Sequence, residues 1–193
     1  MAMDLSKFNW INESELKVED DSFYLLSTPN SDFFCNPADD SVVSDAPFLY
    51  KEVSGDFLIS ARVKPTFQST FDACTVFVYA DDRHWLKIAF EYTDMESHSI
   101  VTVATDHYSD DAIGEEMKEE AVYLQIVRKG DIFACHYSAD GVNYRLARIL
   151  GLKMPAAVKV GVSAQAPTGQ GQFMEFRDLK LTQALPKDMR TSI

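Results

Sequence analysis

The hydrophobic and polar positions of this chain alternate with the period of two that is typical of β-strands, most clearly from Trp85 to Tyr92. One face of that stretch is apolar and carries Leu86, Ile88, Phe90 and Tyr92. The opposite face carries Trp85, Lys87, Ala89 and Glu91. A strand needs one apolar face to bury, but it does not need a tryptophan, a lysine and a glutamate aligned on the other. We therefore expect the second face to be the surface with which this protein recognises a ligand.

The same alternation predicts strands along nearly the whole chain. Residues 71–111 are expected to form three consecutive strands, and residues 56–64 show the half-buried pattern of an antiparallel strand. Further strand-like runs occupy residues 16–19, 23–27, 48–53, 122–129, 132–138, 144–150, 158–164 and 172–181. Only residues 115–121 have any helical character, and so charged a segment is more typical of a solvated loop.

Turn-forming residues separate these runs. Asp20-Asp21, Ser54-Gly55, Lys129-Gly130-Asp131 and Ala139-Asp140-Gly141 are all typical of tight turns. Residues 28–47 are rich in Pro, Asp and Ser, which predicts a long ordered loop. About a dozen short strands with one apolar face each must stack as two sheets or close into a barrel. We predict an all-β sandwich of two antiparallel sheets, with residues 1–193 forming a single domain.

Charge limits the partners of this chain. It has 30 Asp and Glu against 18 Lys and Arg, a formal net charge of −12. Such a surface repels nucleic acid and anionic membranes, both of which are bound through clustered basic residues. No stretch approaches the apolar length of a membrane span, and the N-terminus has no signal-peptide pattern. The three cysteines, Cys35, Cys74 and Cys135, are widely spaced and unpaired by motif, which indicates reduced thiols and a cytoplasmic location.

Short motifs along the chain add to this reading. In order they are SDFF (31–34), GDF (55–57), FD (71–72), WLKIAFE (85–91), HSIVT (98–102), YSD (108–110), LQIVRKG (124–130), YSADG (137–141), VGVSAQAP (160–167) and FRDLKL (176–181). Their order resembles a family of uncharacterised bacterial and fungal proteins, catalogued as a domain of unknown function, which includes a fungal regulation-of-enolase protein. The resemblance implies a concanavalin A-like jelly roll of the lectin and glucanase type. Phe34 and Asp111 stand where the family usually carries tryptophans, and Asp72-Ala73-Cys74-Thr75 replaces its usual Asp-Gln-Ala-Gly.

Jelly rolls of this type often bind carbohydrate on a concave sheet face, and the polar residues of the strands fit that chemistry. Sugars offer apolar ring faces and hydroxyl groups, which an aromatic platform and neighbouring polar groups recognise. We expect Trp85 to stack, Asp72 and Glu91 to accept hydroxyl protons, and Lys87 and Arg128 to donate. Ser99, Thr102 and Asp110 complete the candidate ligand-binding set.

A purely structural interpretation of the same residues remains open. Lys87 and Glu91 lie four residues apart, roughly 13 Å along a regular strand, so each needs a partner on a neighbouring strand or a ligand. Glycoside cleavage requires two carboxyl groups about 5–10 Å apart. Glu91, Asp94 and Glu96 resemble a glucanase motif only superficially, because Glu91 and Asp94 point to opposite faces of a strand. Asp72 with Glu91 is the remaining candidate pair.

No cofactor or metal is expected from spacing along the chain. His84, His98, His107 and His136 show neither close pairing nor an HExxH motif, and the sequence contains no phosphate-binding glycine loop. The acidic doublets at 39–40, 81–82 and 110–111 lack a calcium-loop spacing and are interpreted as solvated turns.

The sequence thus predicts a non-catalytic cytoplasmic binding module for a carbohydrate or a related polar small molecule. Two alternatives belong to other classes. One is a regulatory protein that binds a metabolic enzyme, as the family name suggests, and the other is a carbohydrate-active enzyme.

Overall fold

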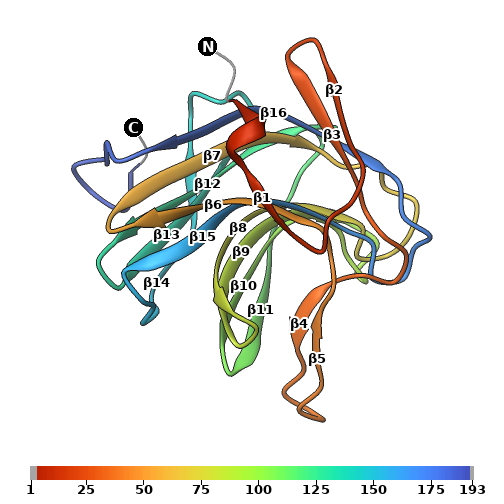
Figure 1. The fold of residues 1–193 in the computed structure, drawn as a ribbon, viewed down its shortest axis with the longest axis horizontal. Helices are drawn as coiled ribbons and strands as arrows, with labels where there is room; N and C mark the ends of the chain where they lie inside the picture. The colour runs from red at the N-terminus through yellow and green to blue at the C-terminus, as the bar shows by residue number, and fades with distance from the viewer. Residues whose placement is uncertain (1–3, 192–193) are drawn as a thin grey trace.

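Two antiparallel seven-stranded sheets stack face to face in the computed structural model, which describes residues 4–191 (Figure 1). The first sheet runs in the order β1 (Asn9–Ile11), β6 (Phe48–Ser54), β15 (Ala157–Gln165), β8 (Ala73–Asp81), β9 (His84–Tyr92), β10 (His98–Asp106) and β11 (Tyr108–Glu116). The second runs β14 (Arg145–Gly151), β13 (Ile132–Ser138), β12 (Val122–Lys129), β7 (Phe57–Lys64), β16 (Phe173–Thr182), β3 (Ser22–Leu26) and β2 (Leu16–Glu19). The chain is an all-β jelly-roll sandwich, as its sequence predicts.

The main core lies between the sheets and is built by strand alternation. Leu86, Ile88 and Phe90 of β9 enter it from the first sheet, and Ile59, Ala61 and Val63 of β7 enter it from the second. Each of these side chains is at most 1% exposed. Burial of aliphatic and aromatic side chains at this interface is the main stabilising contribution to such a sandwich.

Several elements, among them the short strand β1, differ from the sequence prediction. The expected loop at 28–47 contains a short hairpin, β4 (Phe33–Cys35) and β5 (Val42–Ser44), and a 3₁₀ turn forms at Leu5–Lys7. The helical turn considered at 115–121 is absent, because β11 continues as a strand to Glu116. β11 is a fourth strand, added to the three that residues 71–106 form. That strand begins directly after a tight turn at His107, whose φ of 66° allows the chain to reverse at once.

The β4–β5 hairpin covers part of the first sheet's outer face, which is the face turned away from the second sheet (Figure 1). Phe33 packs against Phe77 and Tyr79 with ring centroids 4.7 and 5.9 Å apart. A second, smaller core therefore forms outside the sandwich. It explains why β8 and β9 are buried on both faces although they belong to an antiparallel sheet.

Within residues 4–191, the structure contains no helix with the length and apolar character that crossing a membrane requires.

Candidate functional site

The register of the first sheet places a strip of polar side chains on the outer face beside the hairpin. Lys87 and Glu91 of β9 share that face, and Ser99 of β10 lies directly across from Glu91. Asp111 of β11 lies across Val103 from Lys87, so it also points outward. We call these four residues, together with Asp32 and Gln165, the polar strip.

Lys87 is the organising contact of the polar strip. Its ammonium group donates to Asp32 Oδ1 at 3.0 Å, to the Phe33 carbonyl at 3.0 Å and to Gln165 Oε1 at 2.9 Å. The side chain is 4% exposed, so all three ammonium donors are satisfied within the protein. Lys87 therefore fixes the base of the hairpin onto the sheet.

Glu91 is buried without a partner. It is 8% exposed, and its carboxyl group makes no hydrogen bond or ion pair with any other residue between 4 and 191. Burial raises the pKa of Glu91 to about 8; Lys87 opposes that shift, whereas the charges of Asp111, Asp32 and Asp94 add to it. At neutral pH a large share of Glu91 is therefore protonated, and its carboxyl group can donate as well as accept a hydrogen bond.

Asp111 opens the strip to solvent. Asp111 is an exposed residue, yet partial desolvation by the surrounding protein raises the pKa of its carboxyl group. The positive charge of Lys87 lowers that pKa, and the negative charges of Asp32 and Asp94 raise it. Ile113, two residues further along β11, shares its face and is 47% exposed. An apolar contact thus adjoins the carboxyl groups at the open end of the strip.

Unsatisfied polar atoms lie at the other end. Gln165 Nε2 and Ser163 Oγ on β15 are buried and have no hydrogen-bond partner among the described residues. Gln165 lies across Ala73 from Glu91, so a small side chain separates an unpaired donor from an unpaired carboxyl group. Buried polar groups are normally paired, and both of these could bind a water molecule or a ligand hydroxyl.

Trp85 does not have the position that stacking requires. It lies on the predicted face, but it is 0% exposed, covered by the second core and edge-on to Phe77. Its Nε1–H donates to the Asp82 carbonyl at 3.2 Å. The expected aromatic platform is therefore wrong, because alternation indicates which face a side chain occupies but not whether a distant hairpin covers it.

Asp72 is likewise a structural residue. Its Oδ2 accepts from the Gln68 and Ser69 amides and from Gln172 Nε2, all within 2.8 Å. These contacts join the loop before β8 to the loop before β16, and the side chain is 0% exposed. Asp72 pairs through its backbone with Tyr92, so its side chain has the opposite strand parity to Glu91, and its Oδ1 has no hydrogen-bond partner among the described residues.

Thr102 and Asp110 point to the opposite face of the sheet. Thr102 lies across from Ile88, a residue of the main core, so it faces the second sheet. Asp110 lies across from Ala104 in the same core and pairs with Arg148 of β14 at 2.7 Å. Neither residue belongs to the polar strip, because both have the opposite strand parity to Lys87 and Asp111.

Arg128 lies on β12 in the second sheet, where it binds backbone carbonyls. Its guanidinium group donates to the carbonyls of Gly130, Met154, Pro155 and Ala156 at 2.9–3.4 Å. The side chain is 3% exposed, and its pKa is lowered by burial. The expected role as a ligand donor is therefore wrong: Arg128 anchors the loop before β15.

Of the sequence candidates, the structure brings together Lys87, Glu91 and Ser99. The residues that sequence reasoning missed are Asp32, Asp111 and Gln165, which come from three separate segments. A buried lysine on a strand was the available signal, because it requires a carboxylate from elsewhere in the chain.

Comparison with known proteins fits this architecture. Residues 10–184 match the family model described as "Protein of unknown function (DUF1349)". The chain belongs to this family. A relative in Saccharomyces cerevisiae, "Regulation of enolase protein 1", is 24% identical over 187 residues, which cover 95% of this chain and 93% of the relative.

Solved structures share the fold. A functionally unknown protein from Saccharomyces cerevisiae superposes with a TM-score of 0.88 at 23% identity over 95% of this chain and all of that chain. The GH43 protein BlXynB (K247S mutant) from Bacillus licheniformis has a TM-score of 0.67 at 13% identity, covering 90% of this chain and 39% of that one. The lumenal domain of VIP36, in a Ca²⁺/Man3GlcNAc-bound form, has a TM-score of 0.61 at 8% identity, covering 96% and 87%. At these identities the likeness describes the fold alone.

Proposed function

We propose that this DUF1349 protein is a non-catalytic binding module whose polar strip recognises an uncharged, hydroxyl-rich small molecule, such as a saccharide. The observation that carries the proposal is Glu91, a carboxyl group that is 8% exposed and unpaired among the described residues. A buried carboxyl group without a hydrogen-bond partner is unfavourable, and a ligand hydroxyl would supply that partner.

The charge of the strip selects the ligand class. Glu91, Asp111 and Asp32 supply three carboxyl groups around the single ammonium group of Lys87, and Asp94 adds to the same negative field. Phosphates and acidic sugars would meet repulsion there, because like charges in a desolvated site are unfavourable. Neutral hydroxyl groups can donate to the carboxylates and accept from protonated Glu91 or Gln165 Nε2. Ile113 would contact the apolar face of a ring.

The fold and the thiols support the rest of the proposal. VIP36, which shares the fold, is described in a glycan-bound form. All three cysteines of this chain are free and buried, which fits a reducing compartment and therefore a cytoplasmic location.

The test is a thermal-shift and calorimetric screen of the full chain with neutral and acidic mono- and oligosaccharides. We expect a neutral sugar to raise the melting temperature and Asp111→Asn to remove that shift. Asp110→Asn is the matched control, because it makes the same charge change on the adjacent residue but on the opposite sheet face. A ligand whose affinity falls equally in both variants, or the absence of any binding sugar, would refute the proposal.

A protein partner is the second candidate, suggested by the name of the yeast relative. The observation that favours it is the edge of the first sheet: among residues 4–191 no strand lies beyond β11, and Tyr108 and Ile113 are each 47% exposed there. Exposed edge strands can pair with another chain. Stoichiometric capture of one metabolic enzyme, lost when Ile113→Lys is introduced and independent of sugar, would favour this function.

A carbohydrate-active enzyme is the third candidate, and an activity assay would identify it. Glycan turnover that Glu91→Gln abolishes, while circular dichroism shows that the variant remains folded, would replace the binding proposal with an enzymatic one.

A further inference from the structure

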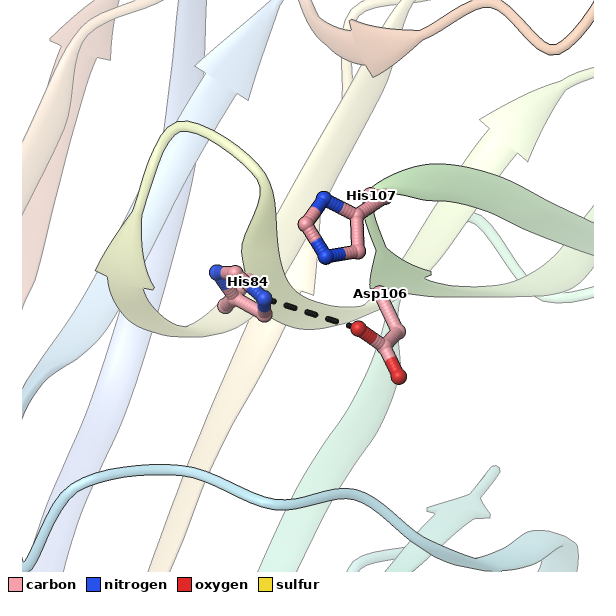
Figure 2. Close-up of side chains that lie close together, drawn as sticks. All are labelled: His84, Asp106 and His107. Carbon is pink, nitrogen blue, oxygen red and sulfur yellow. Dashed lines mark ion pairs between the residues drawn. The ribbon is translucent and has the colours of Figure 1, made fainter.

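A cluster of metal-ligand side chains lies at one end of the first sheet, away from the polar strip. His84 begins β9, Asp106 ends β10, and His107 forms the turn into β11. His84 and Asp106 are register partners, although 22 positions separate them in sequence. One ligand atom from each of the three residues lies within 4.8 Å of the others. Figure 2 shows the three side chains approaching one another from the ends of these strands.

The ring of His84 is oriented by a second carboxylate. Its Nδ1 lies 2.8 and 3.0 Å from the two carboxylate oxygens of Asp81, and Asp81 itself accepts from the Arg83 amide at 2.9 Å. With Nδ1 held by Asp81, Nε2 is the ring nitrogen that faces Asp106 and His107. Carboxylate–histidine pairs of this kind commonly orient metal-binding imidazoles.

Nε2 of His84 faces another electron-rich atom. It lies 3.5 Å from Asp106 Oδ1, as the dashed line in Figure 2 marks. Two carboxylates therefore flank one imidazole, and a cation bound between His84 Nε2 and Asp106 Oδ1 would be attracted by both acidic side chains. Ligand atoms around a tetrahedral zinc ion lie about 3.3 Å apart, which this distance nearly matches.

His107 is held in place by its backbone. Its amide donates to the Arg83 carbonyl at 2.8 Å, and its own carbonyl accepts from Arg83 Nη1 at 3.1 Å. The residue has a φ of 66°, a left-handed conformation that is unfavourable for most residues with a side chain. Its ring packs edge-to-face on that of His84, with centroids 5.0 Å apart. The third ligand is therefore positioned without any hydrogen bond to its ring among the described residues.

We propose that His84, Asp106 and His107 bind a divalent transition metal ion of the zinc class, with solvent completing the coordination. Two imidazoles and one carboxylate favour Zn²⁺ or Cu²⁺ over Ca²⁺ and Mg²⁺, which prefer oxygen ligands. The metal would link the turn between β8 and β9 to the turn between β10 and β11, and would stabilise this rim of the sheet.

The test uses the full, untagged chain after chelator dialysis, titrated with Zn²⁺ by calorimetry and with Co²⁺ by its visible absorption. We expect one equivalent to bind and to raise the melting temperature. His84→Asn and His107→Asn should each weaken Zn²⁺ binding by about 10-fold to 100-fold. Asp81→Asn should weaken it by about 10-fold, because Asp81 orients the ring of His84. Asparagine suits position 107 because it tolerates positive φ.

His98→Asn is the matched control, since His98 is exposed, stacks on Phe67 and lies at the other end of β10. The affinity of the His98→Asn variant for Zn²⁺ should equal that of the native chain. Absence of Zn²⁺ binding by folded native protein, or equal losses in His98→Asn and His84→Asn, would overturn the proposal. Circular dichroism of each variant separates loss of the site from loss of the fold.

Discussion

Lys87 Nζ lies 3.0 Å from Asp32 Oδ1, and this ion pair joins the middle of the first sheet to the base of the β4–β5 hairpin. Asp32 keeps about a fifth of its side chain exposed, whereas Lys87 is almost fully buried. The hairpin excludes water from Phe77 and Trp85, so the pair belongs to the second core as much as to the polar strip.

Lys87→Met should destabilise the protein by about 3 kcal/mol, because it leaves Asp32, Gln165 and the Phe33 carbonyl without their common donor. Urea unfolding measures the loss, and hydrogen exchange should show faster exchange at β4 than in the main core. Lys153→Met, on an exposed side chain, should change stability by less than about 0.5 kcal/mol. If Lys87→Met changed the free energy of unfolding as little as Lys153→Met does, the organising role of Lys87 would be contradicted.

Glu91→Gln should change how stability depends on pH. The folded chain holds this proton with a pKa of about 8, against an ordinary value of 4.5. Because the folded state binds the proton more tightly, its stabilising effect is fully present below about pH 4.5 and is lost as the pH rises to about 8. Glutamine avoids this loss, so the variant should gain on the order of a few kcal/mol relative to the native chain across that range.

Denaturant unfolding at a series of pH values measures this difference between the two proteins. Glu119→Gln, at an exposed position, is the matched control for replacing one glutamate by glutamine. A constant difference between Glu91→Gln and the native chain from about pH 5 to about pH 8 would show that Glu91 is ionised normally.

Arg128→Met should cost about 3 kcal/mol, since it leaves the carbonyls of Met154, Pro155 and Ala156, the first of them buried, without their donor. Under conditions in which Arg128→Met remains folded, its affinity for sugar at the polar strip should equal that of the native chain. Arg145→Met is the comparison, because Arg145 pairs with Glu115 at an exposed position, where such pairs contribute about 0.2–1 kcal/mol. Calorimetric melting curves of the two variants would settle the contrast.

Trp85→Ala should destabilise the protein by about 3–5 kcal/mol, as expected for removing a fully buried aromatic side chain. Trp85→Phe should remain folded and keep the affinity of the polar strip for sugar, because Trp85 has no exposed surface to offer. Trp10→Phe on β1, a half-buried position, provides the reference for stability. A selective loss of sugar binding in Trp85→Phe would instead support the stacking role.

Much of the fold follows from local patterns. The β-strands after residue 47 match the predicted runs closely, apart from β11, because alternation and turn residues act over short distances. The short strands β1, β4 and β5 escaped prediction because three residues are too few to show a period. β11 escaped because its exposed, charged residues lack an apolar face.

By itself, the sequence determined the sandwich, its family and the face of β9 that carries Lys87 and Glu91, since strand parity is a local property. Tertiary structure decided what each polar residue does. The hairpin at 33–44 covers Trp85 and supplies Asp32, and the sheet register brings Asp111 and Gln165 to the strip and Asp106 beside His84. These contacts join residues tens of positions apart, and only the register and packing of the folded chain fix which of them meet.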